Sequence, residues 1–182
     1  MTSNKKSILF LDIDGVLNND VEFERWRNWP DHTPLPGDSR DASWCISQDN
    51  MDQLNRIIRE TNCTIVLSST WRTLFPLQLI ELHLKKFGFI GELSDKTPDF
   101  TWSGGWGGSR DWQPRFKEIN SWLMLHKGEY DSYVIVDDLI EADNAMGRYE
   151  QTFETKGLTK QNADNIIKLF KAQETNPLSQ HV

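Results

Sequence analysis

The 182-residue sequence has little cysteine, no excess of positive charge and no long apolar run, and each shortage excludes a class of protein. Its 2 cysteines, Cys45 and Cys63, lack the spacing of a metal or redox motif, and we expect both thiols to be reduced. The 27 acidic residues outnumber the 20 basic ones, for a net charge of -7. This charge argues against strong binding of duplex nucleic acid, although it is compatible with a local basic pocket for one phosphate.

No stretch approaches the roughly 20 apolar residues that a membrane span requires, so we expect no membrane association. The apolar residues that follow Lys5 and Lys6 resemble the start of a signal peptide. Asp12 and Asp14 interrupt this run early, and no small-residue cleavage site follows it. We therefore expect the protein to be cytoplasmic.

Short apolar runs alternate with helical patterns along the whole chain. Buried strands are predicted at 8–11, 63–67 and 133–136, with shorter strands at 89–93 and 148–153. Helices are predicted at 47–61, 77–87, 114–128 and from 159 onward. The alternation predicts an α/β fold, in which helices cover both faces of a mainly parallel sheet. We expect a single domain over residues 1–182.

Three segments lack a clear period. Residues 18–46 are predicted to be an insertion or lid over the strand ends. Residues 95–112 are rich in Gly and Trp and are predicted to form a loop, in which Trp102 and Trp106 are candidates for stacking on a base. The polar tail 173–182 is expected to be frayed.

Polar side chains follow the three apolar strands directly. They are Asp12 and Asp14 after the first, Ser68, Ser69 and Arg72 after the second, and Asp137 and Asp138 after the third. The carboxyl ends of parallel strands lie at one edge of a sheet, where ligands bind in open α/β folds. Carboxylates gathered there repel one another unless a cation lies among them, and oxygen ligands of this kind suit Mg²⁺ with a substrate phosphate.

The remaining groups at these strand ends are suited to phosphate chemistry. Serine hydroxyls and the planar guanidinium of arginine can bind the phosphate oxygens that the metal leaves open. An aspartate can attack phosphorus and form an aspartyl-phosphate. A second aspartate, two residues further on, can protonate the leaving oxygen and later activate water.

This constellation resembles the haloacid dehalogenase (HAD) superfamily of phosphatases. The likeness rests on the D-I-D-G of residues 12–15, on Ser68 at the end of the second strand and on the closing pair Asp137-Asp138. It implies a Rossmann-like three-layer sandwich, with Asp12 as nucleophile and Asp14 as general acid and base. It also implies that Asp12, Asp138 and the backbone carbonyl of Asp14 hold Mg²⁺, with Asp137 bonded directly or through water.

The resemblance further implies a basic residue at the start of the helix before the last motif, and both Arg115 and Lys117 qualify. Ser68 and Ser69 would bind the phosphate together with that residue. Arg72 and Asn18 are further candidates near the substrate. The family often has Gly where Phe116 stands here, a departure within the third motif.

Longer motifs indicate which part of this superfamily the sequence resembles. S-S-T-W-R at 68–72, the helix R-F-K-E-I-N-S-W-L, the strand Y-V-I-V-D-D and G-L-T at 157–159 are similar to the phosphatase-like domains of multifunctional RNA-repair proteins. The 3′-phosphatase domain of phage polynucleotide kinase is a more distant likeness. The resemblance implies a phosphorylated nucleotide or nucleic-acid end as substrate, or another phosphorylated small molecule. It also implies a possible kinase or ligase partner in RNA or DNA repair.

Two other classes of protein place aspartates at strand ends. A non-catalytic phospho-acceptor signalling domain has its acidic pair after the first strand, whereas the pair here follows a late strand. A metal-dependent nuclease has its D-x-D on a late strand and a Glu on an early one, which is the reverse of the order here.

Overall fold

The computed structural model of the chain describes residues 6–28, 45–100, 114–139 and 147–175. Strands and helices alternate along the chain, as the sequence predicts. In order they are β1 (Ser7–Leu11), α1 (Asp20–Arg27), α2 (Gln48–Thr61), β2 (Thr64–Leu67), α3 (Trp71–Leu74), α4 (Leu77–Lys86), β3 (Leu93–Lys96), α5 (Pro114–Leu125), β4 (Ser132–Asp137), β5 (Tyr149–Gln151) and α6 (Lys160–Thr175).

The five strands form one sheet in the order β3-β2-β1-β4-β5, and every pair in it is parallel. The central strand β1 sets the alignment, because Leu11 pairs with Leu67 of β2 and with Val136 of β4. The residues that follow these three are Asp12, Ser68 and Asp137. The polar groups predicted to meet at one edge of the sheet therefore begin in a single row.

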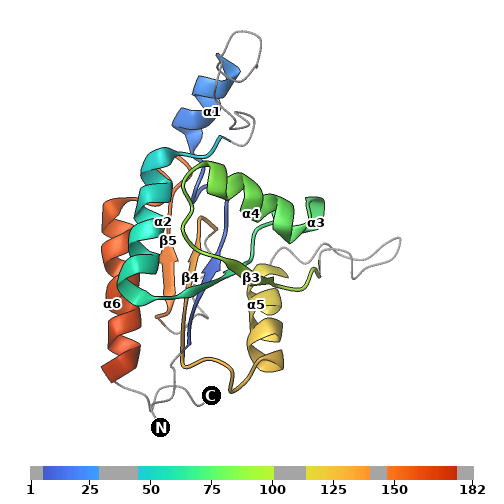
Figure 1. Ribbon diagram of the computed structural model, residues 1–182, viewed down its shortest axis with the longest axis vertical. Helices are drawn as coiled ribbons and strands as arrows, with labels where there is room; N and C mark the ends of the chain where they lie inside the picture. Colours follow the sequence, from blue (N-terminus) through green and yellow to red (C-terminus); the bar gives the residue numbers. More distant parts are fainter. Residues whose placement is uncertain (1–5, 29–44, 101–113, 140–146, 176–182) are drawn as a thin grey trace.

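Helices cover both faces of this sheet in three layers (Figure 1). On one face, α2, α4 and α6 pack on the alternate strand residues that include Leu9 and Leu11. On the other face, α5 packs on the intervening residues, which include Ile8 and Phe10. All five residues of β1 are buried, which explains its uninterrupted apolar sequence. The predicted α/β class and the parallel sheet are confirmed.

Several boundaries differ from the sequence prediction. Residues 20–27, predicted to be part of an irregular insertion, form helix α1. Asn19 caps it by accepting a hydrogen bond from the Glu22 amide, and none of its residues is buried, so it has no apolar face that periodicity could detect. Residues 29–44 lie outside the described part of the chain.

The strand predicted at 89–93 is wrong, because the structure forms β3 at Leu93–Lys96. Phe89 packs into the core instead, and the strand uses the polar residues Asp95 and Lys96 that were assigned to a loop. Trp102 and Trp106 lie outside the described residues.

The predicted frayed tail also begins later than expected, since α6 continues to Thr175. The buried Gln173 side chain bonds both backbone groups of Tyr133, which anchors the helix end to β4. Cys45 and Cys63 are both buried and are not joined in a disulfide. Within the described ranges, no helix has the length and apolar character needed to cross a membrane.

Gly157 lies where the segment before α6 passes the turn that follows β1. Its φ is +64°, and the next residue donates its amide to the Val16 carbonyl at 2.8 Å. A Cβ at this glycine would lie 2.0 Å from Asn50 Nδ2 and 2.6 Å from the Val16 oxygen. The chain therefore approaches too closely here for any side chain, and this contact supports the turn that carries Asp14.

We predict that Gly157→Ala lowers the free energy of unfolding by on the order of 3 kcal/mol. The added methyl group would overlap with neighbouring atoms, and alanine is also disfavoured in the left-handed backbone conformation. Gly128→Ala is the matched control. Gly128 also has a positive φ, of +93°, but no atom lies within 4 Å of its Cβ position, so only about 1 kcal/mol should be lost. Urea unfolding measures both variants. Equal losses would contradict the close contact.

Candidate active site

Three carboxylates meet at the carboxyl edge of the sheet. Asp12 follows β1, Asp137 ends β4 and Asp138 comes directly after it. Asp12 and Asp137 are 3% and 2% exposed, and Asp138 is half-buried. One oxygen from each lies within 4.8 Å of the others. Such proximity of buried negative charges is unfavourable unless cations compensate it.

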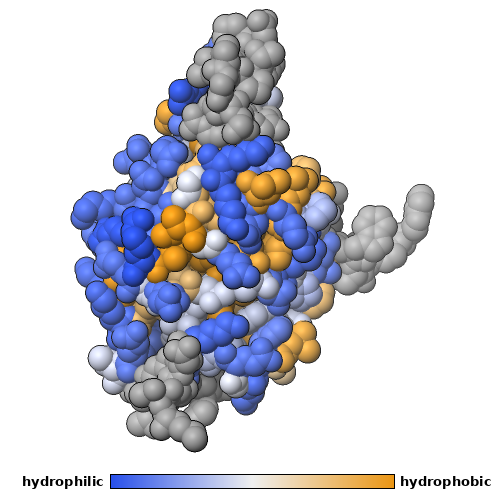
Figure 2. Space-filling view, viewed as in Figure 1, coloured by the Kyte–Doolittle hydropathy of each residue, from blue (hydrophilic) through white to orange (hydrophobic). Residues whose placement is uncertain are grey.

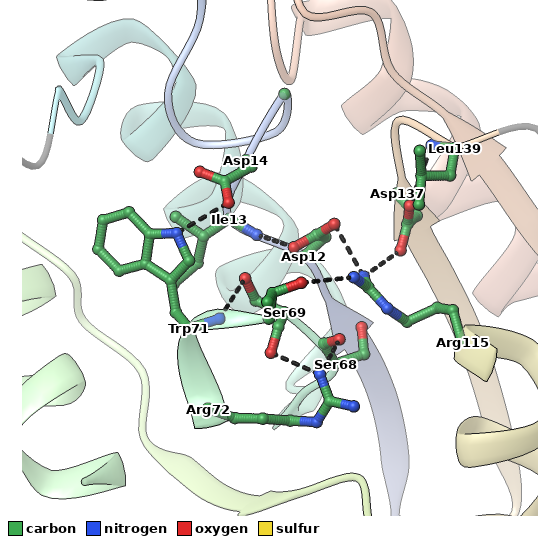
Figure 3. Close-up of polar contacts among 12 residues, drawn as sticks. Asp12, Ile13, Asp14, Ser68, Ser69, Trp71, Arg72, Arg115, Asp137 and Leu139 are labelled. Atoms are coloured by element: carbon green, nitrogen blue, oxygen red, sulfur yellow. Dashed lines mark hydrogen bonds and ion pairs between the residues drawn. The ribbon is translucent and has the colours of Figure 1, made fainter. Parts of the chain in front are cut away.

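Arg115 supplies part of that compensation (Figure 3). Its Nη1 donates to Asp12 Oδ2 at 2.8 Å and to Asp137 Oδ2 at 2.6 Å. The residue lies in the first turn of α5, which Ile119 and other apolar residues hold against the sheet. Burial alone would lower the pKa of Arg115, but the charges of Asp12 and Asp137 outweigh it and raise the pKa. Lys117, the other candidate for this position, is exposed.

The carboxylates of Asp137 and Asp138 keep raised pKa values despite Arg115. Burial, followed by the charge of Asp12, raises the pKa of Asp137 to about 7. The same two causes raise the pKa of Asp138 to about 6. The acidic cluster therefore carries uncompensated negative charge at neutral pH, which favours binding of a further cation.

Asp14 points away from this cluster and toward α3 (Figure 3). Its Oδ2 accepts a hydrogen bond from Trp71 Nε1 at 2.9 Å, and its Oδ1 accepts one from Asn18 Nδ2 at 2.8 Å. The buried Asn18 also accepts the Gly15 amide at 2.9 Å, which closes the turn after β1. Asn18 thus lies beside Asp14 and fixes its orientation.

The two serines after β2 are both fully buried. The Ser68 amide donates to the Leu11 carbonyl at 2.9 Å, which continues the β1–β2 pairing, but its hydroxyl has no hydrogen-bond partner among the described residues. The Ser69 hydroxyl accepts the Trp71 amide at 3.3 Å. A buried hydroxyl left unsatisfied is unfavourable unless a ligand completes its hydrogen bonding, so Ser68 is suited to binding an anion.

Arg72 follows Ser68 and Ser69 closely in the sequence and was predicted to lie near the substrate, but its guanidinium is bonded within the protein. It is 4% exposed, and its guanidinium donates to the backbone carbonyls of Ser68, Ser69, Thr97 and Pro98 and to Glu118. These contacts use all five of its N–H donors. In this arrangement Arg72 ties the loop after β2 to the loop after β3 and to α5, and it has no donor left for a phosphate.

Three residues that the sequence argument did not single out complete the site: Trp71, Glu118 and Thr152. The Thr152 hydroxyl donates to the Gly15 carbonyl at 2.8 Å, and its amide donates to the Asp137 carbonyl at 3.0 Å. No local pattern marks Thr152 or Glu118, since each acts across the fold. Trp71 lies within S-S-T-W-R, so its position beside Arg72 was a usable signal.

Gly15 allows the turn after β1 to approach Asp138. Its φ is +65°, and a Cβ there would lie 2.7 Å from the Asp138 side chain. The D-x-D-G pattern thus has a steric reason in this chain. The all-oxygen donor set of Asp12, Asp137 and Asp138 fits Mg²⁺, and the unsatisfied Ser68 hydroxyl nearby fits the phosphate that usually accompanies this ion.

Comparison with known proteins identifies one family. Residues 8–163 match the family model described as the HAD domain in Swiss Army Knife RNA repair proteins. The match includes every candidate site residue, from Asp12 to Asp138. No curated protein and no solved structure matches the chain at a significant level.

We predict that Mg²⁺ stabilises the protein more at about pH 8 than at about pH 5. The raised pKa values mean that the folded state binds more protons than the unfolded state between about pH 4 and 7, so the free energy of unfolding falls as the pH rises. A bound cation replaces those protons, and its benefit grows as they leave. The thermal midpoint with and without millimolar MgCl₂ measures this at both pH values.

Asp138→Asn should remove the response to Mg²⁺ and raise the metal-free midpoint at about pH 8 by ~2–4 °C. It removes a charge whose burial and repulsion by Asp12 together cost about 1 kcal/mol after allowance for solvent screening. Glu92→Gln, which changes an exposed acid, is the control. An undiminished response to Mg²⁺ in Asp138→Asn would contradict a cation site at this cluster.

We also predict that Arg72→Met lowers the free energy of unfolding by about 3–5 kcal/mol, because it removes the ion-pair partner of the buried Glu118 carboxylate. Glu118→Leu should act similarly, and the double variant should lose less than the sum of the two. Lys85→Met, which breaks an exposed pair with Glu81, should cost less than about 1 kcal/mol. Additive losses at Arg72 and Glu118 in urea unfolding would contradict the buried pair.

Proposed function

The chain belongs to the family of HAD domains in Swiss Army Knife RNA repair proteins, and on that premise we propose that it is a Mg²⁺-dependent phosphohydrolase. It removes a terminal phosphate from a nucleotide or nucleic-acid end through an aspartyl-phosphate intermediate. The observation that supports this most directly is the meeting of Asp12, Asp137, Asp138 and Arg115 at one edge of the sheet, beside the unsatisfied hydroxyl of Ser68.

Asp12 is the proposed nucleophile. Its Oδ1 accepts the Ile13 amide at 2.7 Å and its Oδ2 contacts Arg115, so the carboxylate is held in one orientation before substrate arrives. An Asp12 oxygen attacks phosphorus, the bond from phosphorus to the ester oxygen breaks, and the electron pair leaves with that oxygen. The phosphoryl group is then carried on Asp12.

Asp14 is the proposed general acid and base. It gives its proton to the leaving oxygen as the ester bond breaks, and it later takes a proton from the water that attacks the aspartyl-phosphate. The second attack breaks the bond between phosphorus and Asp12, which restores the carboxylate and releases inorganic phosphate. Asn18 and Trp71 orient Asp14 through their hydrogen bonds to its two oxygens.

Asp12, Asp138 and the backbone carbonyl of Asp14 would hold Mg²⁺, with Asp137 bonded directly or through water. When bound, the ion would neutralise negative charge on the phosphate and lower its repulsion from Asp12. Ser68, Ser69 and Arg115 would hold the phosphate oxygens. Arg115 rather than Lys117 takes this role in the proposal, because its guanidinium already lies between two of the carboxylates whereas Lys117 is exposed.

The occurrence of this family in RNA repair proteins supports a nucleic-acid end as the substrate and a repair enzyme as the partner. The net charge of -7 supports contact with a strand end rather than with the length of a duplex. A phosphorylated small molecule is the other substrate class. For Arg72 we propose a positioning role in place of direct phosphate binding, since its donors are all engaged within the protein.

The test is release of inorganic phosphate from a 3′-phosphorylated oligoribonucleotide, its 5′-phosphorylated counterpart and a sugar phosphate, with and without Mg²⁺. We expect release that requires Mg²⁺ and is greatest for an oligonucleotide. Asp12→Asn should abolish it, because the amide lacks the negative charge of the nucleophile. Arg115→Met should lower it by on the order of 100-fold, as the loss of a preorganised charge at a reacting phosphate does.

Lys117→Met is the matched control and should retain activity. Full activity in Asp12→Asn would remove this residue from the mechanism. A phosphoprotein that persists without turnover would instead indicate a phospho-acceptor domain. Cleavage of internal, unphosphorylated linkages would indicate a nuclease.

A further inference from the structure

Helix α3 begins two residues after Ser69 and places Trp71 directly against Asp14 (Figure 3). The indole Nε1 donates to Asp14 Oδ2 at 2.9 Å, and the two residues are 57 positions apart in the sequence. One side of the indole packs against the main core cluster, and the residue as a whole stays half-exposed. The indole is therefore held in place beside Asp14 while part of the residue remains exposed.

The position of Asp14 determines where the leaving group of the substrate lies. A general acid must come within hydrogen-bond distance of the oxygen that it protonates, directly or through one water. The group attached to that oxygen therefore lies beside Asp14. Since Trp71 contacts Asp14, the leaving group lies beside the indole as well.

The residues that follow Trp71 at the end of α3 add exposed apolar surface beside the indole. Leu74 is 67% exposed and Phe75 is 36% exposed, and the ring centroids of Trp71 and Phe75 are 6.1 Å apart at an interplanar angle of 57°. We call Trp71, Leu74 and Phe75 the α3 surface. Figure 2 shows residues of high hydropathy at the surface in the region of α3 and the neighbouring α4. Grouped exposed apolar residues of this kind often mark a binding surface.

We propose that the α3 surface receives the nucleobase of the terminal nucleotide, so that the leaving group is a nucleoside or an oligonucleotide end. This inference rests on the proposed phosphohydrolase function and names its substrate class. A flat base presents a π-face that can stack on an aromatic side chain, whereas a sugar has no such face. Stacking on an aromatic side chain tolerates every base, which suits an enzyme that acts on strand ends of any sequence.

A purely supporting role for Trp71 gives different expectations. If the indole only orients Asp14 through its N–H, its loss slows the reaction equally for substrates with and without a base. If the α3 surface also binds the base, its loss selectively removes the advantage of the base-bearing substrate. Phe75 separates the two cases further. Its ring cannot orient Asp14 through a hydrogen bond, and it is the more exposed of the two aromatic residues.

The experiment compares two oligoribonucleotides that carry a 3′-phosphate, one with a normal terminal nucleotide and one whose terminal ribose lacks its base. We expect the wild type to show a kcat/KM on the order of 10-fold higher for the base-bearing substrate. Trp71→Leu and Phe75→Leu should bring this ratio close to 1. Trp71→Phe should keep most of the ratio and lower kcat for both substrates, because it retains a ring but lacks the N–H.

Leu125→Ala is the control, since this residue is 75% exposed at the far end of α5 and should leave the ratio unchanged. Circular dichroism and thermal unfolding establish whether each variant is folded. If Trp71→Leu does not fold, Phe75→Leu alone is sufficient to test the α3 surface. A wild-type ratio of 1, or a ratio that neither leucine variant changes, overturns the inference and leaves the phosphohydrolase proposal in place.

Binding of the same two oligonucleotides to the Asp12→Asn variant tests the α3 surface independently of turnover. If this variant binds the base-bearing oligonucleotide more tightly than the abasic one, and Phe75→Leu removes the difference, the α3 surface is supported. That result, combined with no phosphate release by the wild type, would overturn the proposed reaction and not the binding surface. Equal binding of both oligonucleotides would overturn the surface.

Discussion

The repulsion among buried carboxylates at the edge of the sheet is the constraint on which the rest of the site depends. Asp12 and Asp137 are nearly inaccessible to water, and each contacts the same nitrogen of Arg115. Beside this one guanidinium, burial and then the charge of Asp12 still raise the pKa values of Asp137 and Asp138. The cluster is therefore suited to a further cation, and in the proposed reaction that cation would accompany the substrate phosphate.

Two arginines at this site have different roles because they face different acceptors. Arg115 contacts the carboxylates of Asp12 and Asp137, whereas Arg72 is enclosed by backbone carbonyls and by Glu118. The two are nevertheless connected, since Glu118 lies one helical turn after Arg115 on α5. The buried pair of Arg72 and Glu118 thus fixes the helix that carries Arg115, and it also fixes the carbonyls of the two serines after β2.

The strand ends of the site were predictable from the sequence because buried parallel strands consist of uninterrupted apolar residues, and the polar residues that follow them mark where the strands end. The helix from Ser47 was equally clear, since its cap and its periodic face agree. Arg72 was not predictable, because its acceptors at Thr97 and Pro98 come from a loop that only the fold brings near. Helix α1 has no buried face, and β3 carries polar residues at the sheet edge, so neither has a periodic signal. The residues around Trp102 and Trp106 lie outside the described chain.

In the proposed reaction, the residues that would hold phosphate cannot by themselves select a substrate, because every phosphomonoester would present the same group to the carboxylates, to Ser68 and to Arg115. Discrimination must come from residues that contact what the phosphate is attached to. In the proposed reaction Asp14 would mark that side, since its proton would go to the leaving oxygen, and Trp71 is the residue that donates a hydrogen bond to Asp14. An indole that both orients the acid and covers the leaving group would link recognition to chemistry. A substrate without a base would then lose contact energy beside the group that must transfer the proton.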